Sequence, residues 1–260
     1  RLYFRDHEDD QFDLLFDSEE EAQSYVDKYK AAVVAEGDKI VAERMSFSPQ
    51  PQSSMVIIDQ HTGYVKAIVG GRGKKTASLT LNRATDPYRQ PGSTFKPLAV
   101  YGPAINDLSL TLADTYVDQA ITYEDTHRPV KNAYSGYRGT MTIRDAIKVS
   151  CNTIAIQAFR DLTPRVGYNY LKRLGFEEVT DHKVINGQVF DDAREPTALG
   201  GITTGVSTLE LTAAYAAIAN KGTYIKPVFY TKVLDQDGNV LLENKPKTEQ
   251  VFRDSTAYLL

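Results

Sequence analysis

The sequence of 260 residues predicts an α+β fold, in which an antiparallel sheet is flanked by helices. Residues 55–58 and 64–69 are apolar runs joined by the turn sequence of residues 59–63, a pattern typical of paired strands. From residue 93 onward the chain carries repeated helix start and stop signals. Near the carboxyl end, Asp237-Gly238 separates two further apolar runs and predicts a hairpin.

Composition restricts the class of protein. Hydrophobic residues make up 42% of the chain and charged residues 25%, as in an ordinary globular domain. The net charge of −4 argues against nucleic acid as the main partner. No apolar run approaches the roughly 20 residues that a membrane-spanning helix needs. Cys151 is the only cysteine, so a disulfide within the chain is excluded.

The first 52 residues differ from the rest of the chain in their sequence pattern. Ser18 and Glu21 form a capping-box pattern, which predicts a helix running to about Glu36. Residues 40–47 alternate between apolar and polar side chains, so we predict a strand there. The Pro- and Ser-rich sequence that follows is typical of a linker. We therefore predict a small linker or appendage over residues 1–52 and the main domain over 53–260.

The main domain carries its helix signals in chain order. Thr142 and Asp145 indicate one helix start, and Pro164 indicates another helix, which closes near Gly175. Another capping box precedes the apolar helix that ends at residues 220–222; it consists of Ser207 and Glu210.

Ser93 and Lys96 place a hydroxyl and an amine three residues apart. If the chain is helical from about Ser93, both groups lie on one face of the helix. Pro97 is tolerated only near a helix start, which puts Ser93 close to the amino end, where N–H groups favour a developing alkoxide. A desolvated lysine can take the proton of a serine. The pattern predicts an activated serine nucleophile.

Downstream, Ser150-Cys151-Asn152 supplies a second hydroxyl and an amide. Ser-x-x-Lys followed by Ser-x-Asn is the order of motifs in penicillin-binding proteins and class A β-lactamases. Further segments of the sequence resemble class A penicillin-binding proteins, namely 56–63, 82–84, 89–97, 198–206 and 213–224. The resemblance runs from about Met55 to the end and implies a serine β-lactamase-like fold, with a five-stranded antiparallel sheet packed against helices.

The third motif of that family, Lys-Thr-Gly, is absent. Residues 247–249 (Lys-Thr-Glu) and 75–77 (Lys-Thr-Ala) are near misses, but the family needs glycine in third place. We expect the sheet to be incomplete up to Leu260 and to be completed by a remaining carboxyl-terminal segment of the same domain. Without that segment, the chain is expected to have little activity.

The resemblance implies a role for each motif residue. Ser93 is expected to be the nucleophile and Lys96 the base, although which group accepts the proton is disputed in this family. Ser150 is expected to pass the proton onward, and Asn152 to bind the substrate backbone or hold Lys96. The Ser93 N–H is expected to form half of an oxyanion hole.

By resemblance, the chain is a peptidoglycan D,D-transpeptidase that acts on D-Ala-D-Ala stem peptides and is acylated by β-lactams. The parent protein is expected to lie on the outer face of a bacterial cell membrane, anchored upstream of Arg1 and carrying a glycosyltransferase domain. A D,D-carboxypeptidase or a β-lactamase-type acyl-serine hydrolase is the alternative. A binding or sensing module that keeps the fold without turnover is a third reading.

Other candidate sites are weaker. The four histidines are scattered without metal-ligand spacing, so neither a metal nor a cofactor is predicted. The Gly-rich run at 70–76 lacks the spacing of a phosphate loop. Glu195-Pro196 resembles the setting of the deacylating glutamate of class A β-lactamases, but Leu199 stands where those enzymes carry asparagine. We expect a slow acyl-enzyme and a packing role for Cys151.

Overall fold

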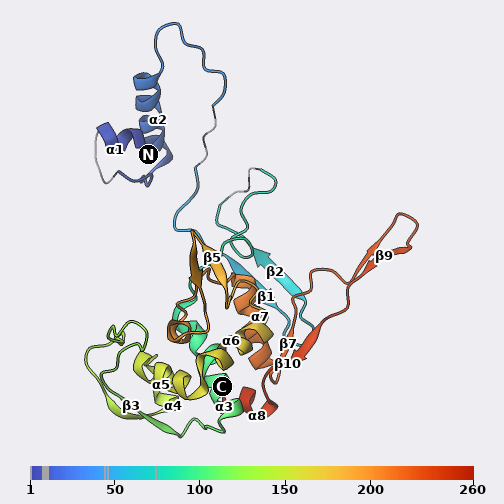
Figure 1. The fold of residues 1–260 in the computed structure, drawn as a ribbon. Coiled ribbons are helices and arrows are strands. Elements are labelled where there is room, and N and C mark those ends of the chain that lie inside the picture. Colours follow the sequence, from blue (N-terminus) through green and yellow to red (C-terminus); the bar gives the residue numbers. More distant parts are fainter. Residues whose placement is uncertain (1, 8–11, 44, 46, 74, 76) are drawn as a thin grey trace. The chain divides into compact units, whose positions relative to one another are not determined.

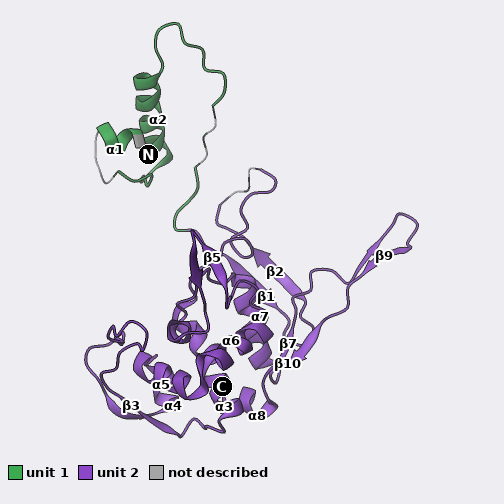
Figure 2. Ribbon diagram, in the orientation of Figure 1, with its two compact units in different colours: residues 1–51 green, residues 52–260 purple. Residues whose placement is uncertain are grey.

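The computed structural model describes residues 2–7, 12–43, 45, 47–73, 75 and 77–260. The chain divides into two compact units, Arg1–Pro51 and Gln52–Leu260, which Figure 2 shows in different colours.

The first unit contains α1 (Leu2–His7) and α2 (Glu19–Val33). The Ser18 hydroxyl accepts a hydrogen bond from the Glu21 N–H at 3.1 Å, which confirms the predicted helix start. The helix ends three residues before the predicted Glu36. Aromatic rings from both helices and the connecting segment contact one another, including Phe4 against Tyr25 and Phe12.

The strand predicted over residues 40–47 is wrong for the residues that the structure describes. Residues 40–43, 45 and 47 have no regular secondary structure, while residues 44 and 46 lie outside the described part. An alternating pattern becomes a strand only where a second strand takes up its backbone hydrogen bonds. Among its described residues, the first unit offers no such partner.

The second unit combines helices with short antiparallel strand pairs (Figure 1). Its helices and helical turns are η1 (Gly92–Phe95), η2 (Lys96–Tyr101), α3 (Gly102–Asp107), α4 (Ile143–Lys148), α5 (Asn152–Leu162), α6 (Pro164–Arg173), η3 (Glu195–Leu199), α7 (Thr208–Ala219) and α8 (Asp254–Leu259). Its strand pairs are β1 (Met55–Ile58) with β2 (Val65–Val69), β3 (Thr115–Asp118) with β4 (Gly139–Thr142), β5 (Lys183–Ile185) with β6 (Gln188–Phe190), β7 (Thr223–Ile225) with β10 (Thr248–Gln250), and β8 (Lys232–Leu234) with β9 (Val240–Glu243).

The hydrophobic core lies among the helices. Phe95, Tyr101, Phe159, Phe176 and Phe252 are among its largest fully buried side chains, and they come from η1, η2, α5 and the segments after α6 and β10. Burying one such ring stabilises the fold by about 1.5–3 kcal/mol. The segment of η1 and η2 thus runs through the centre of the core, and its first turn carries Ser93.

Most predicted elements are confirmed. β1, β2, the β8–β9 hairpin and helices α4, α6 and α7 lie within a few residues of their predicted positions, and Ser207 and Glu210 form the predicted reciprocal capping box. Within the described residues, β1 and β2 form a two-stranded sheet, and an isolated parallel bridge joins Tyr64, just before β2, to Val228. The middle of the chain is less purely helical than predicted, because it also holds the pairs β3–β4 and β5–β6.

Candidate active site

The chain around Ser93 is helical, but it is not the regular α-helix that the sequence predicts. It runs from the 3₁₀ turn η1 into the π-helical turn η2 and then into α3. Pro103 has no N–H to donate, and the helix widens into the π turn before it, where the Pro97 carbonyl accepts from the Gly102 N–H. Side chains three residues apart eclipse one another in a 3₁₀ helix, so Ser93 and Lys96 lie on one face.

The Lys96 side chain is buried and fully hydrogen-bonded. It is only 3% exposed. Its Nζ donates to the Ser150 carbonyl at 2.6 Å, to the Ser150 Oγ at 2.9 Å and to the Asn152 Oδ1 at 2.6 Å. Burial lowers the pKa of Lys96 from 10.5 to about 8, and the Cys151 sulfur acts in the opposite direction with a smaller effect. At neutral pH, a fraction of this amine is therefore unprotonated.

Ser150 lies in a tight turn between α4 and α5. Its φ of +53° is in the left-handed region, which costs a non-glycine residue about 1 kcal/mol. Hydrogen bonds hold the turn: the Ser150 N–H donates to the Ile147 carbonyl at 3.0 Å, and the Cys151 N–H donates to the Ala146 carbonyl at 2.8 Å. The turn directs both oxygens of Ser150 toward the Lys96 amine.

The structure thus brings three of the four predicted site residues into contact. The fourth, Ser93, lies one 3₁₀ turn before Lys96, whose N–H donates to the Ser93 carbonyl. The Ser93 side chain is exposed, and no described residue forms a hydrogen bond with its hydroxyl. The exposed hydroxyl, on the same face of the turn as Lys96, is open to an incoming substrate.

The segment of residues 200–206 packs directly against the Ser93 turn. The side-chain amide of Gln90 donates to the Ile202 carbonyl at 2.6 Å and accepts from the Ile202 N–H at 2.9 Å. Arg89 and Val206 exchange backbone hydrogen bonds in an isolated bridge. These contacts fix the chain that follows Gly200, which has a φ of +79° and faces the backbone of Gly92.

Replacing Gly200 with alanine is expected to disturb this packing strongly. A Cβ atom there would lie 2.3 Å from the Gly92 carbonyl oxygen and 2.4 Å from the Gly92 nitrogen. Gly187 is a matched control, because its φ of +78° is nearly the same but nothing lies within 4 Å. In melting experiments, Gly187→Ala should cost about 1 kcal/mol from backbone strain alone, and Gly200→Ala about 2–4 kcal/mol. Equal losses would show that the Gly92 contact is unimportant.

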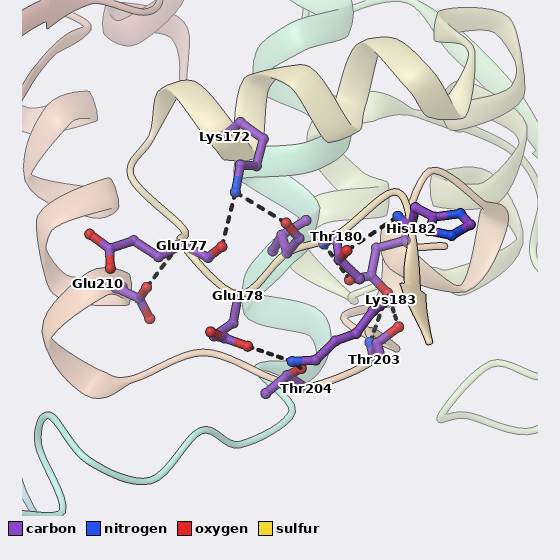
Figure 3. A network of polar contacts seen from close by, with 11 residues as sticks. Lys172, Glu177, Glu178, Thr180, His182, Lys183, Thr203, Thr204 and Glu210 are labelled. Carbon is purple, nitrogen blue, oxygen red and sulfur yellow. Dashed lines mark hydrogen bonds and ion pairs between the residues drawn. The ribbon is translucent and has the colours of Figure 1, made fainter. Parts of the chain in front are cut away.

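A polar network also contacts Thr203 and Thr204 of this segment (Figure 3). The Lys183 amine donates to Glu178 at 2.6 Å and to the Thr204 hydroxyl at 3.0 Å. Asp192, which is fully buried, accepts from the N–H and hydroxyl of Thr203 at 2.7 and 2.6 Å, and from the Thr180 N–H. The network therefore ties residues 203–204 to the loop after α6.

Glu195 is bound through both of its carboxylate oxygens. Its carboxylate pairs with the Arg160 guanidinium, and its second oxygen accepts from the Glu124 N–H at 2.8 Å. The residue is 7% exposed. Both oxygens are thus engaged in holding the loop of residues 122–124 against α5, which favours a structural role.

The remaining candidates occupy other positions. Cys151 is fully buried, with its sulfur 3.3 Å from the Thr153 hydroxyl, which agrees with the expected packing role. The near miss at Thr248-Glu249 lies in β10 with exposed side chains, and residue 76 of the other near miss lies outside the described part. No helix among the described residues is long and apolar enough to cross a membrane, and no cluster of three metal-ligating side chains occurs among them.

Sequence reasoning missed several residues that hold this site. Asn132 accepts from the N–H of Asn152, Asp118 accepts from Asn132, and Tyr215 donates its hydroxyl to the Thr94 carbonyl. Each partner lies 14 or more residues away, so no local spacing connects them. Gln90 stands inside the Ser93 segment, but nothing in its sequence context indicates the bond to Ile202.

The fold and this cluster define a class of protein. The penicillin-binding protein transpeptidase domain family matches residues 53–260, and the chain belongs to this family. Its structural neighbours have the serine β-lactamase-like fold that the sequence predicts.

The relatives are named bacterial penicillin-binding proteins. The chain is 39% identical over 228 residues to penicillin-binding protein 1A of Clostridium tetani, and 37% identical over 207 residues to penicillin-binding protein 1F of Bacillus subtilis. It covers 27% of each of these relatives, while 81% and 80% of the chain is covered. The chain thus spans about a quarter of their length.

Two solved structures have a fold similar to that of this chain. The crystal structure of penicillin-binding protein 1A from Haemophilus influenzae matches with a TM-score of 0.62 at 30% identity, over 76% of this chain and 28% of that one. The PonA1 protein from Mycobacterium tuberculosis, solved in complex with penicillin V, matches with a TM-score of 0.66 over 90% of this chain and 57% of that one. At 23% identity, the second match supports the fold alone.

Proposed function

We propose that residues 53–260 belong to a peptidoglycan D,D-transpeptidase that forms cross-links through an acyl-enzyme on Ser93. The observation that carries the proposal is the Lys96 amine, buried one 3₁₀ turn after Ser93 and held by Ser150 and Asn152. Membership in the transpeptidase domain family supports the reaction type.

The acylation step requires the proton of Ser93 to leave. In its ammonium form, Lys96 uses all three N–H donors on Ser150 and Asn152. When Lys96 loses one proton, a lone pair replaces a donor, and the amine becomes an acceptor within the same cluster. The pKa of about 8 makes this form accessible near neutral pH.

The proposed reaction has two stages, acylation of Ser93 and transfer of the acyl group to an amine. Ser93 Oγ attacks the carbonyl carbon of the penultimate D-Ala, and its proton passes to Lys96 Nζ. The bond from that carbon to the nitrogen of the terminal D-Ala then breaks, and Ser150 Oγ relays the proton from Lys96 to the departing amine. The amine of a neighbouring stem peptide then attacks the ester carbonyl carbon, and the bond from that carbon to Ser93 Oγ breaks. One proton of the amine passes through Ser150 Oγ and Lys96 to Ser93 Oγ, which forms the cross-link and restores the serine. The Ser93 N–H is one donor to the oxyanion.

We further propose the setting of this reaction. The substrates are peptidoglycan stem peptides, and β-lactams acylate Ser93 because their strained amide resembles D-Ala-D-Ala. The domain works on the outer face of a bacterial cell membrane, in a protein that is anchored there and carries a glycosyltransferase domain. Residues 1–52 form the linker that precedes the transpeptidase domain, and a segment after Leu260 supplies the Lys-Thr-Gly strand.

Product analysis tests the proposal. The full-length protein is incubated with nascent glycan strands that carry pentapeptide stems, and the digested products are separated by chromatography and mass. Cross-linked dimers that disappear after penicillin treatment are the expected result. Free D-Ala without dimers would instead indicate a D,D-carboxypeptidase. Glu195, the one candidate for a deacylating base, is engaged with Arg160 and Glu124, which favours the transpeptidase.

A further inference from the structure

Asp118 is a buried carboxylate that the proposed mechanism does not use. It ends β3 and is 1% exposed. Its Oδ1 accepts from the Asn132 amide at 2.8 Å and from the Thr153 hydroxyl at 2.6 Å. Its Oδ2 accepts from the Tyr134 hydroxyl at 2.7 Å and from the Arg138 N–H at 2.8 Å. Four donors from two segments, the loop of residues 132–138 and helix α5, thus converge on one side chain.

The charge on Asp118 is stable in this position. Burial by itself raises the pKa of the carboxyl group, but hydrogen bonds from Thr153, Tyr134, Arg138 and Asn132 outweigh it and bring the pKa to about 2. The group therefore remains ionised throughout the physiological range. Hydrogen bonds to an ionised acceptor are stronger than neutral ones, so the carboxylate holds its four donors firmly.

Asn132 connects Asp118 to the start of α5. The residue that precedes α5, Cys151, makes no capping hydrogen bond with its side chain. The Asn132 Oδ1 takes that place: it accepts from the Asn152 N–H at 2.8 Å and from the Thr153 N–H at 3.4 Å. An amide can present its oxygen to the helix only while its nitrogen faces elsewhere, and the bond to Asp118 fixes that orientation.

The helix start held in this way carries the site residues. The Asn152 Oδ1 accepts from the Lys96 amine, while its Nδ2 donates to the Lys131 carbonyl at 2.7 Å. Lys131 therefore holds the side chain of Asn152, and Asn132 holds its backbone. Ser150, two residues earlier, has a strained φ of +53°, and such a turn persists only when its surroundings hold it.

We propose that Asp118 is a positioning residue for the reaction: through Asn132 and Thr153 it sets the start of α5, and thereby the placement of Ser150 and Asn152 around the Lys96 amine. The proposal rests on the function proposed above. Asp118 acts only through other residues and does not touch substrate.

The test compares the acylation kinetics of variants of the full-length protein with a fluorescent penicillin. Asp118→Asn keeps the shape, but its amide nitrogen faces either the Asn132 and Thr153 donors or the Tyr134 and Arg138 donors. The hydroxyl of each pair can turn and accept, whereas the bond from the Asn132 amide or from the Arg138 N–H is lost, together with the charge of the acceptor. We expect the second-order rate constant for acylation to fall about 10- to 100-fold, because small displacements of catalytic groups have effects of this size. Asp161→Asn is the control, because it makes the same exchange at an exposed position of α5. The new amide oxygen can still accept from the Tyr116 hydroxyl, so the rate constant should not change.

A pH profile separates positioning from loss of stability. If the turn loosens, water reaches Lys96 and its pKa rises, so the pH midpoint of acylation should move up by about half a unit or more. A purely structural role would lower the fraction of protein that labels, while the rate constant and midpoint of the labelled fraction stay unchanged, and that result would overturn the proposal. Tyr134→Phe removes one donor to Asp118 at little cost in packing. It should lower the acylation rate constant and raise the pH midpoint, each by less than Asp118→Asn does.

The outcomes also distinguish this proposal from the proposed function. If the unmodified protein is not acylated at all, the proposed function fails. If it is acylated on Ser93, but Asp118→Asn reacts at the same rate and with the same midpoint, the function stands and the role of Asp118 is refuted. If Asp118→Asn does not fold, Tyr134→Phe decides the matter by the same two quantities.

Discussion

Ser93→Ala is expected to abolish covalent labelling of the full-length protein by a fluorescent penicillin. Alanine has no oxygen to form the ester, and removal of the nucleophile from a serine enzyme costs about 10⁶-fold in rate. The Ser93 side chain is exposed, so its replacement should change the free energy of unfolding by no more than about 0.5 kcal/mol. The loss of labelling should therefore appear in a protein that melts normally.

Ser255→Ala is the control for this experiment. Ser255 is an exposed serine in α8, outside the cluster around Lys96, and labelling of this variant should equal that of the unmodified protein. Mass spectrometry of a proteolytic digest should find the penicilloyl group on the peptide that contains Ser93. Undiminished labelling of Ser93→Ala, or a label on another peptide, would remove Ser93 from the mechanism.

Local chemistry explains which parts of this protein could be predicted from sequence. The capping box of Ser207 and Glu210 and the Asp237-Gly238 turn act between residues a few positions apart, and both occur in the structure as predicted. The spacing of Ser93 and Lys96 is likewise local: it places both side chains on one face in a 3₁₀ turn as well as in an α-helix.

Features that depend on distant partners could not be predicted. The apolar and polar alternation of residues 40–47 is the same signal as in a true strand. Its described residues are not a strand, because no strand occurs to pair with them in the described part of the first unit. The side chain of Asn132 caps α5 from 20 residues away. The cysteine that precedes the helix gives no indication in the sequence that another segment supplies the cap. The depressed pKa of Lys96 also arises from burial, which motif spacing does not report.

The acylation rate constant is expected to rise with pH and to level off above a midpoint near 8. Lys96 must be neutral to take the Ser93 proton, and its pKa is lowered to about 8 because burial disfavours the ammonium form. The neutral fraction is then roughly one tenth at pH 7 and roughly nine tenths at pH 9, which predicts a rise of about tenfold. Second-order rate constants measured with a β-lactam between pH 6 and 9.5 check this.

Lys96→Arg should remove both the activity and its pH dependence. Arginine keeps the positive charge beside Ser150 and Asn152, but its guanidinium does not deprotonate in proteins, so it cannot serve as the base. A loss of about 10²- to 10⁴-fold is expected from the removal of general-base catalysis. Lys232→Arg, on the exposed β8 strand, makes the same exchange away from the site and should keep the profile unchanged. A rate constant of the unmodified protein that still rises tenfold per pH unit up to pH 9.5 would mean that Lys96 titrates like a solvated lysine, because only burial among Ser150, Asn152 and the core separates its pKa from 10.5.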